Sequence, residues 1–94
     1  MTQDSVRDNR AEQEFELEVD GRRAIAAYQR EGDRIVFTHT HVPKAIEGRG
    51  IGSKLIRAAL DQVRDEGLKV VAQCPFVAAF IERHPEYRDL LARG

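Results

Sequence analysis

The chain has few of the residues that build several common kinds of binding site. It contains a single cysteine, Cys74, which excludes an internal disulfide and a cysteine-cluster zinc site. It has no tryptophan, four phenylalanines and two tyrosines, which is little material for a surface that stacks nucleic-acid bases. The formal net charge is −1, so nonspecific attraction to nucleic acid or to an anionic membrane is not expected. We therefore expect neither a metal site nor a nucleic-acid partner.

Long apolar runs are also missing. No run approaches the roughly 18 apolar residues that span a bilayer. Residues 1–14 are polar and lack the apolar centre of a signal peptide, so a cytoplasmic protein without membrane association is expected. A chain of 94 residues with 41% hydrophobic residues is typical of one small globular domain. We expect residues 1–13 to form a flexible N-terminal tail and residues 14–94 to form the domain.

The first half of the domain has the pattern of β-strands. Residues 14–19 alternate glutamate with Phe15, Leu17 and Val19, which predicts a strand with one face in water. The pair Asp20–Gly21 is a strong hairpin signal. Residues 22–30 predict a second strand, and residues 34–42, rich in β-branched side chains, predict a third. The short turns between them indicate an antiparallel meander.

The second half changes to a helical pattern. Apolar residues at three- and four-residue spacing predict a helix over about 51–66, with Gly67 as the residue that ends it. Residues 68–74 are apolar on both faces and predict an interior strand, reached by a right-handed parallel crossover. Pro75 is placed to open a second helix. The expected fold is α/β, with a mixed, mostly antiparallel sheet and the element order β-β-β-α-β-α.

Three glycines in "EGRGIGSKLIRAAL" stand directly before the first predicted helix. The first N–H groups of a helix lack internal partners, and glycines let an anion approach them closely. Arg49 and Lys54 add positive charge beside the same position. The spacing fits neither the dinucleotide fingerprint nor the P-loop. From the residues alone, an anion site and a merely tight turn both remain open.

The same stretch carries a family resemblance. "VPKAIEGRGIGSKLIRAAL" after a strand resembles the coenzyme A pyrophosphate loop of the GNAT N-acetyltransferase superfamily, whose pattern is Gln/Arg-x-x-Gly-x-Gly/Ala. Gly50 and Gly52 match the last two places, whereas Glu47 stands at the first. Together with "LKVVAQCPFVAAFIERHPEY", the chain is similar to the small single-domain YjdJ-type branch over about residues 14–91. The resemblance implies a minimal GNAT acyl-CoA N-acyltransferase fold.

The resemblance also implies a ligand and its contacts. It implies acetyl-CoA as co-substrate, in a cleft where the strands over 34–42 and 68–74 splay apart. The pyrophosphate is expected to bind the backbone of the loop formed by Arg49, Gly50, Ile51, Gly52 and Ser53. The positive charge of Lys54 is expected to assist this binding. The pantetheine arm is expected along His41 and Val42. The thioester side is expected against Phe76, Ala79 and Phe80.

Two residues are candidates for the chemistry. Larger members of the superfamily often carry a tyrosine as general acid on the last helix, and here Ile81 stands at that place. Cys74 precedes Pro75 at a helix N-terminus, which favours the thiolate, so it is a candidate acetylated nucleophile or proton relay. It is equally well a buried core residue. By strand parity His41 shares a face with Ile35 and Phe37, which makes it either a general base at the cleft or an ordinary strand histidine.

The sequence therefore predicts an acetyl-CoA-dependent N-acetyltransferase that moves an acetyl group to an unidentified amine. The acceptor, a small molecule or a protein, cannot be read from the residues. The alternative is an acyl-CoA-binding or partner-binding module without transferase activity. A monomer or a weak homodimer is expected.

Overall fold

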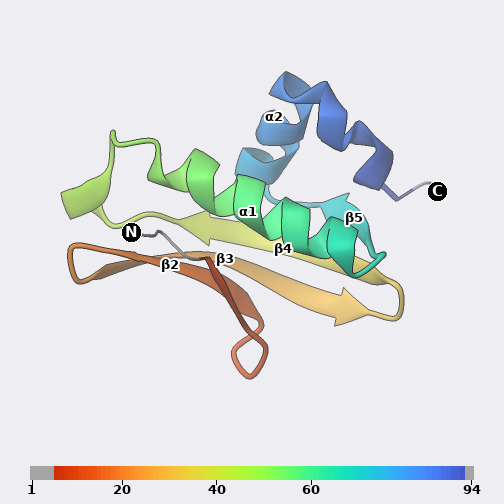
Figure 1. Ribbon diagram of the computed structural model, residues 1–94, viewed down its shortest axis with the longest axis horizontal. Helices are drawn as coiled ribbons and strands as arrows, with labels where there is room; N and C mark the ends of the chain where they lie inside the picture. Colours follow the sequence, from red (N-terminus) through yellow and green to blue (C-terminus); the bar gives the residue numbers. More distant parts are fainter. Residues whose placement is uncertain (1–5, 93–94) are drawn as a thin grey trace.

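The computed structural model describes residues 6–92, and it consists of a five-stranded sheet with two α-helices on one of its faces (Figure 1). The strands follow one another across the sheet in chain order. They are β1 (Arg7–Asn9), β2 (Glu14–Val19), β3 (Arg22–Glu31), β4 (Arg34–His41) and β5 (Lys69–Ala72). Strands β1 to β4 pair antiparallel, and β5 pairs parallel with β4. The α/β class and the mixed, mostly antiparallel sheet are thus confirmed.

The helices are α1 (Ile51–Asp65) and α2 (Pro75–Arg83). A short 3₁₀ helix, η1 (Lys44–Ile46), precedes α1, and a second one, η2 (Pro85–Leu90), follows α2. Helix α1 crosses the sheet and contacts β2 to β5, and α2 packs beside it over β4 and β5 (Figure 1). Gly67, with φ of +74°, ends α1 as predicted, and its N–H donates to the Arg64 carbonyl. Within residues 6–92 no helix is long and apolar enough to cross a bilayer.

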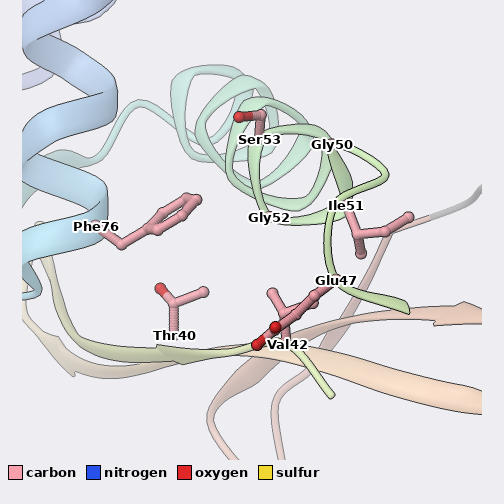
Figure 2. Close-up of a pocket in the computed structure, with 9 residues that line it drawn as sticks. Thr40, Val42, Glu47, Gly50, Ile51, Gly52, Ser53 and Phe76 are labelled. Carbon is pink, nitrogen blue, oxygen red and sulfur yellow. The ribbon is translucent and has the colours of Figure 1, made fainter. Parts of the chain in front are cut away.

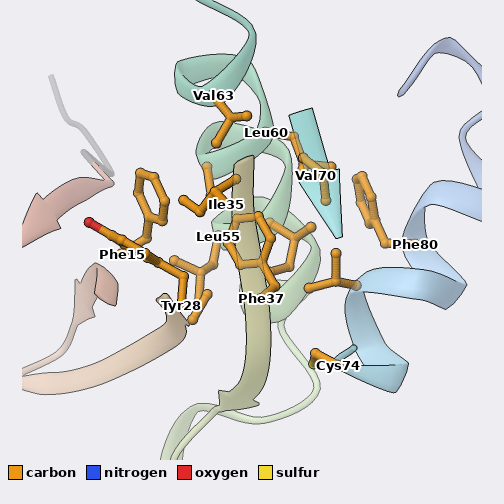
Figure 3. Close-up of a cluster of buried hydrophobic side chains, with 14 of the residues drawn as sticks. Phe15, Tyr28, Ile35, Phe37, Leu55, Leu60, Val63, Val70, Cys74 and Phe80 are labelled. Carbon is orange, nitrogen blue, oxygen red and sulfur yellow. The ribbon is translucent and has the colours of Figure 1, made fainter. Parts of the chain in front are cut away.

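The core lies between the sheet and the helices (Figure 3). Three aromatic rings form its centre, with the Phe15 ring 5.3 Å from that of Tyr28 and 6.0 Å from that of Phe37. Leu55 and Leu60 of α1 cover these rings and are fully buried. Each buried side chain of this size contributes about 1.5–3 kcal/mol. The apolar face that the alternation predicts for β2 packs against the apolar face that the spacing predicts for α1. The sequence pattern therefore predicted the two faces that form this core.

The segment before residue 14 differs from the flexible tail that we expected for residues 1–13. Residues 1–5 lie outside the described part of the chain, but residues 7–9 form β1 and pair with β2. Polar contacts hold this strand: Arg7 forms an ion pair of 2.6 Å with Glu16, and Asn9 donates to the same carboxylate at 3.0 Å. The tail prediction was wrong here because it relied on apolar periodicity, and this strand is held by polar pairs instead.

Glu16 is also unlike the solvated strand residue that the alternation predicted. Its side chain is only 3% exposed, because Arg7, Asn9 and Arg23 surround it. Glu14 hydrogen-bonds to it, and this bond together with the contacts to Arg7 and Asn9 lowers the pKa of Glu16 to about 2. A carboxylate with these partners stays charged although it is buried, which ties β1 to the sheet at neutral pH.

Strand β5 corrects a second expectation. Its apolar residues predicted an interior strand, yet β5 is the last strand of the order. Among the described residues, its outer side carries a bridge between Val70 and Leu91, and the Ala92 N–H donates to the Val70 carbonyl at 2.8 Å. Val70 is buried beneath the helices, whereas Val71 on the other face is half-buried. The C-terminal residues therefore protect the edge that the apolar run led us to place inside the sheet.

Tyr28→Phe tests whether the N-terminal strand is anchored from the core. The Tyr28 hydroxyl donates to Asp8 at 2.5 Å, and burial followed by this hydrogen bond raises the pKa of the hydroxyl, which therefore stays protonated. We expect the variant to lose about 1–3 kcal/mol of unfolding free energy, since the ring is kept and a charged acceptor loses its donor. Hydrogen exchange at residues 6–13 should accelerate.

The matched control is Tyr87→Phe. Tyr87 is also buried, and its hydroxyl donates at 2.7 Å to Asp61 of α1 rather than to a residue of the N-terminal strand. It should cost a similar amount of stability without accelerating exchange at residues 6–13. Equal local exchange in the two variants would contradict the anchoring role of Tyr28.

Candidate active site

A pocket of about 400 Å³ opens between the end of β4, the loop before α1 and the start of α2 (Figure 2). The residues that line it are Thr40, Val42, Glu47, Gly48, Gly50, Ile51, Gly52, Ser53 and Phe76. Six of them, namely Val42, Gly50, Ile51, Gly52, Ser53 and Phe76, were assigned to coenzyme A from the sequence. The structure brings these six together around one cavity.

The pocket exists because two neighbouring strands separate. The pairing of β4 with β5 ends at Phe37 and Ala72. There the Phe37 carbonyl accepts hydrogen bonds from both Gln73 N–H, at 3.1 Å, and Cys74 N–H, at 2.9 Å. The chain then turns into α2 while β4 runs on to His41. Thr38–His41 consequently have no strand partner on that side among the described residues.

The glycine loop brings the N-terminus of α1 to this opening. Gly48 and Gly50 have φ of +83° and +71°, a region that favours glycine, and Gly50 is the N-cap. The first hydrogen bond of the helix runs from Lys54 N–H to the Gly50 carbonyl at 3.0 Å. The N–H groups of residues 51–53 precede that bond and have no acceptor within the helix. Their partial positive charge suits an anion in the pocket.

Phe76 and Gly52 pack directly against each other. A Cβ atom on Gly52 would lie 2.6 Å from Cζ of Phe76, closer than side chains tolerate. Figure 2 shows the Phe76 ring reaching from α2 toward Gly52 at the start of α1. A side chain at Gly52 would therefore displace the exposed Phe76 ring, whereas Gly48 and Gly50 are favoured by the backbone conformation.

A second, smaller cavity of about 90 Å³ adjoins the pocket. It is lined by Ser53, Phe76, Ala79, Phe80 and Arg83. Ser53 and Phe76 line both cavities, so they stand between the two. Ala79 and Phe80, which the sequence assigned to the thioester side of coenzyme A, line only this second cavity.

Cys74 lies behind the wall of the pocket. It is the N-cap of α2, as predicted, with Pro75 in the first turn, but its side chain makes no capping hydrogen bond. The thiol is 2% exposed and sits at the edge of the core (Figure 3). Its Sγ is 3.2 Å from Oγ1 of Thr40, a residue that lines the pocket. The thiol itself lines neither cavity and contacts the pocket wall through the Thr40 hydroxyl.

His41 does not share a face with Phe37, and that prediction was wrong. Tyr28 pairs with Phe37 but Ala27 pairs with His39, so Thr38 is an extra residue in β4, a β-bulge. The bulge reverses the alternation, and Thr40 now pairs with the buried Ala26. His41 pairs with Ile25 on the face away from the helices, is exposed and does not line the pocket.

The charges around the pocket differ from those predicted. Arg49 does not line the cavity, because both of its terminal nitrogens bind Asp20 in the β2–β3 turn, at 2.6 and 2.8 Å. Lys54 is exposed and lies outside the lining of both cavities. Glu47 does line the pocket, so a carboxylate stands opposite the helix N-terminus. No group of three or more metal-ligating side chains is assembled within residues 6–92.

The comparisons with known proteins agree with this geometry. The model of the GCN5-related N-acetyl-transferase family matches residues 14–90, which covers strands β2 to β5, the glycine loop and both α-helices. The chain belongs to this family.

Named relatives and a solved structure support the assignment. This acetyltransferase-family chain is 37% identical to Protein NATD1 of mouse, over 85% of its own length and 76% of the mouse protein. It is 32% identical to Protein NATD1 of zebrafish, over 89% of its length and 81% of the relative. The solution structure of a GCN5-like protein from Staphylococcus aureus superimposes with a TM-score of 0.72 at 26% identity, over 98% of this chain and 91% of the other. The minimal GNAT fold is thereby confirmed.

Two residues of this GCN5-related domain were missed from the sequence. Thr40 was passed over because strand parity, without the bulge, placed it on the opposite face from the cleft. Arg83 was passed over because nothing in the helical pattern of α2 separates it from an ordinary exposed arginine. The bulge that turns Thr40 toward the pocket is formed by Thr38 in the same strand, whose hydroxyl donates to the Ala27 carbonyl at 3.3 Å. No local sequence signal identifies such a bulge.

Glu47→Gln tests the electrostatic balance of the pocket. With inorganic pyrophosphate as probe at low ionic strength, we expect the variant to bind about fivefold more tightly than the unmodified chain. Two unit charges about 4 Å apart in water interact by about 1 kcal/mol. The substitution removes the negative charge of Glu47, which repels the anionic probe. Calorimetry or chemical-shift titration would measure the difference.

Glu82→Gln is the charge-matched control. Glu82 is an exposed residue of α2 that lines a different surface groove, and its substitution changes the net charge by the same amount. It should leave the affinity for pyrophosphate nearly unchanged. An equal gain in both variants would attribute the effect to net charge and contradict a local role of Glu47.

Proposed function

We propose that this domain transfers the acetyl group of acetyl-CoA to an amine. The observation that carries the proposal is a coincidence of three features around one pocket. They are a glycine-flanked helix N-terminus, a stretch of β4 without a partner on one side, and a thiol behind the pocket wall. The helix N-terminus suits an anion, and the unpaired stretch of β4 suits an extended chain. The thiol suits the transfer of an acyl group.

The residues fit coenzyme A. The N–H groups at the start of α1 would hold the pyrophosphate, and Cβ atoms built on Gly48 and Gly50 would meet nothing within 4 Å, so the loop surface is open. The backbone of β4 around Thr40 and Val42 would hold the pantetheine arm as a neighbouring strand would. Phe76 supplies an exposed apolar wall. Acetyl-CoA would supply an activated thioester, and the chain would supply its position.

Cys74 is the group that we propose for the chemistry. In both open mechanisms its thiol proton passes to the departing coenzyme A thiolate as the thioester C–S bond breaks. As a nucleophile, Cys74 forms the new C–S bond itself, and the amine attacks the resulting acetyl-cysteine. As a relay, it only gives the proton while the amine attacks the thioester directly. In both routes the Cys74 thiolate that remains takes up the proton that the nitrogen releases as the amide forms, which restores the thiol. Thr40 positions the sulfur through its contact of 3.2 Å.

The geometry gives His41 no place in this proposal. Its side chain lies on the sheet face away from the helices and outside the lining of the pocket. The amine must therefore arrive neutral or lose its proton to another group, and the acceptor stays unidentified.

Gly50→Val tests the binding site. A β-branched side chain at φ of +71° strains the loop and projects into the anion site, so we expect coenzyme A to lose its stabilising effect on the melting temperature. Gly67→Val is the control with matched strain, because Gly67 has φ of +74° at the other end of α1. That variant should lower the melting temperature and still respond to coenzyme A. A normal response in Gly50→Val would refute the assignment of the loop.

Cys74→Ala tests the chemistry. We expect nearly unchanged affinity for coenzyme A and a loss of acetyl transfer of about 10²-fold or more, the usual size of an acid–base contribution. Transfer would be measured as thiol release from acetyl-CoA with spermidine and a lysine-containing peptide as acceptors. Mass spectrometry of the unmodified chain distinguishes nucleophile from relay, since only the nucleophile retains an acetyl group.

Val63→Ala is the control for destabilisation. Val63 is a buried residue of α1 that lines neither cavity, so its truncation lowers stability without touching the site. It should keep its turnover. Coenzyme A binding without turnover in the unmodified chain would instead favour the binding module.

A further inference from the structure

Arg83 lines a cavity, and its charged side chain has no partner among the described residues. It is exposed at the end of α2 and lines the smaller cavity together with Ser53 and Phe76. Within residues 6–92 no ion pair, hydrogen bond or ring contact engages its guanidinium. Arg83, whose guanidinium has no partner among the described residues, therefore lines a cavity that adjoins the proposed pyrophosphate site.

Nearby arginines are different. Arg57 lies over the Phe80 ring at 5.6 Å and pairs with Glu86 at 3.7 Å. Arg64 binds Asp89 at 2.8 Å, and Arg49 binds Asp20. Each of these guanidinium groups is held by a carboxylate of the chain. Arg83, by contrast, lines the cavity and pairs with no carboxylate of the described residues.

We propose that Arg83 binds the 3′-phosphate of coenzyme A and so makes the domain distinguish coenzyme A from 3′-dephospho-coenzyme A. This inference rests on the proposed function, because it needs coenzyme A in the larger pocket. There the pyrophosphate occupies the N-terminus of α1, which leaves the 3′-phosphate as the other charged group of the nucleotide. The smaller cavity, of about 90 Å³, suits a phosphate group rather than a whole adenine ring. This proposal replaces the thioester that the sequence led us to expect against Ala79 and Phe80, because the two ends of the cofactor cannot share one cavity of this size.

The chemistry of the two groups is complementary. A phosphate monoester carries between one and two negative charges at neutral pH and three acceptor oxygens. A guanidinium offers a planar fork of donors that binds two of these oxygens at once, which an ammonium group cannot match. Ser53, whose hydroxyl in Figure 2 is directed toward the side on which α2 lies, adds a neutral donor between the two cavities.

The experiment compares the dissociation constants of coenzyme A and 3′-dephospho-coenzyme A by calorimetry. The unmodified chain should bind coenzyme A about tenfold more tightly, the usual range for one charge-assisted contact at an exposed site. Arg83→Gln should bring this ratio close to one by weakening only coenzyme A. Arg83→Lys keeps the charge in the last helical turn but loses the fork, and it should retain part of the preference.

Arg88→Gln is the matched control. Arg88 is likewise exposed and unengaged among the described side chains, but it lines other surface grooves. It should keep the full preference for coenzyme A. A preference that survives in Arg83→Gln, or an equal loss for both nucleotides, would overturn the role of Arg83. Binding of both nucleotides with equal affinity by the unmodified chain overturns this inference alone, whereas no binding of either overturns the proposed function as well.

Discussion

The carbonyl oxygen of Phe37 decides where the sheet stops and the site begins. It accepts the N–H groups of both Gln73 and Cys74, so the chain after β5 leaves the sheet at this point. From there β4 continues without a neighbour and α2 starts. One shared acceptor thus produces the opening, aims the first turn of α2 at the helix α1 N-terminus and places Cys74 behind the wall. The adjacent bulge at Thr38 then selects Thr40 to face the opening.

Local chemistry explains what the sequence predicted correctly. The glycines before α1, the end of that helix at Gly67 and the start of α2 at Pro75 depend on backbone preferences of single residues, which a sequence displays directly. Gly52 is the exception in its cause. It was assigned to ligand approach, but the structure also shows that a Cβ at that position would displace the Phe76 ring.

Contacts between distant residues explain what the sequence could not show. The reversal of His41 depends on an extra residue in β4 relative to β3, which only the pairing of the two strands reveals. Strand β1 depends on polar groups of β2 and β3, and the edge position of β5 depends on Leu91 and Ala92. The proposal for Arg83 depends on the cavity that this residue lines, which the sequence does not reveal. Each is a statement about neighbours in space rather than about residue type.

A chain of 94 residues has little core to give up for chemistry, and this constrains the kind of group that it can bury. Glu16 illustrates the cost: one carboxylate at 3% exposure requires Arg7, Asn9 and Arg23 around it. A catalytic acid beside the pocket would need a comparable set of partners. A thiol packs as a small apolar group, so Cys74 needs only the Thr40 hydroxyl while it contributes to the core. If a reactive group stands beside the pocket, as we propose, a cysteine is therefore the one that this fold accommodates with the smallest loss of stability.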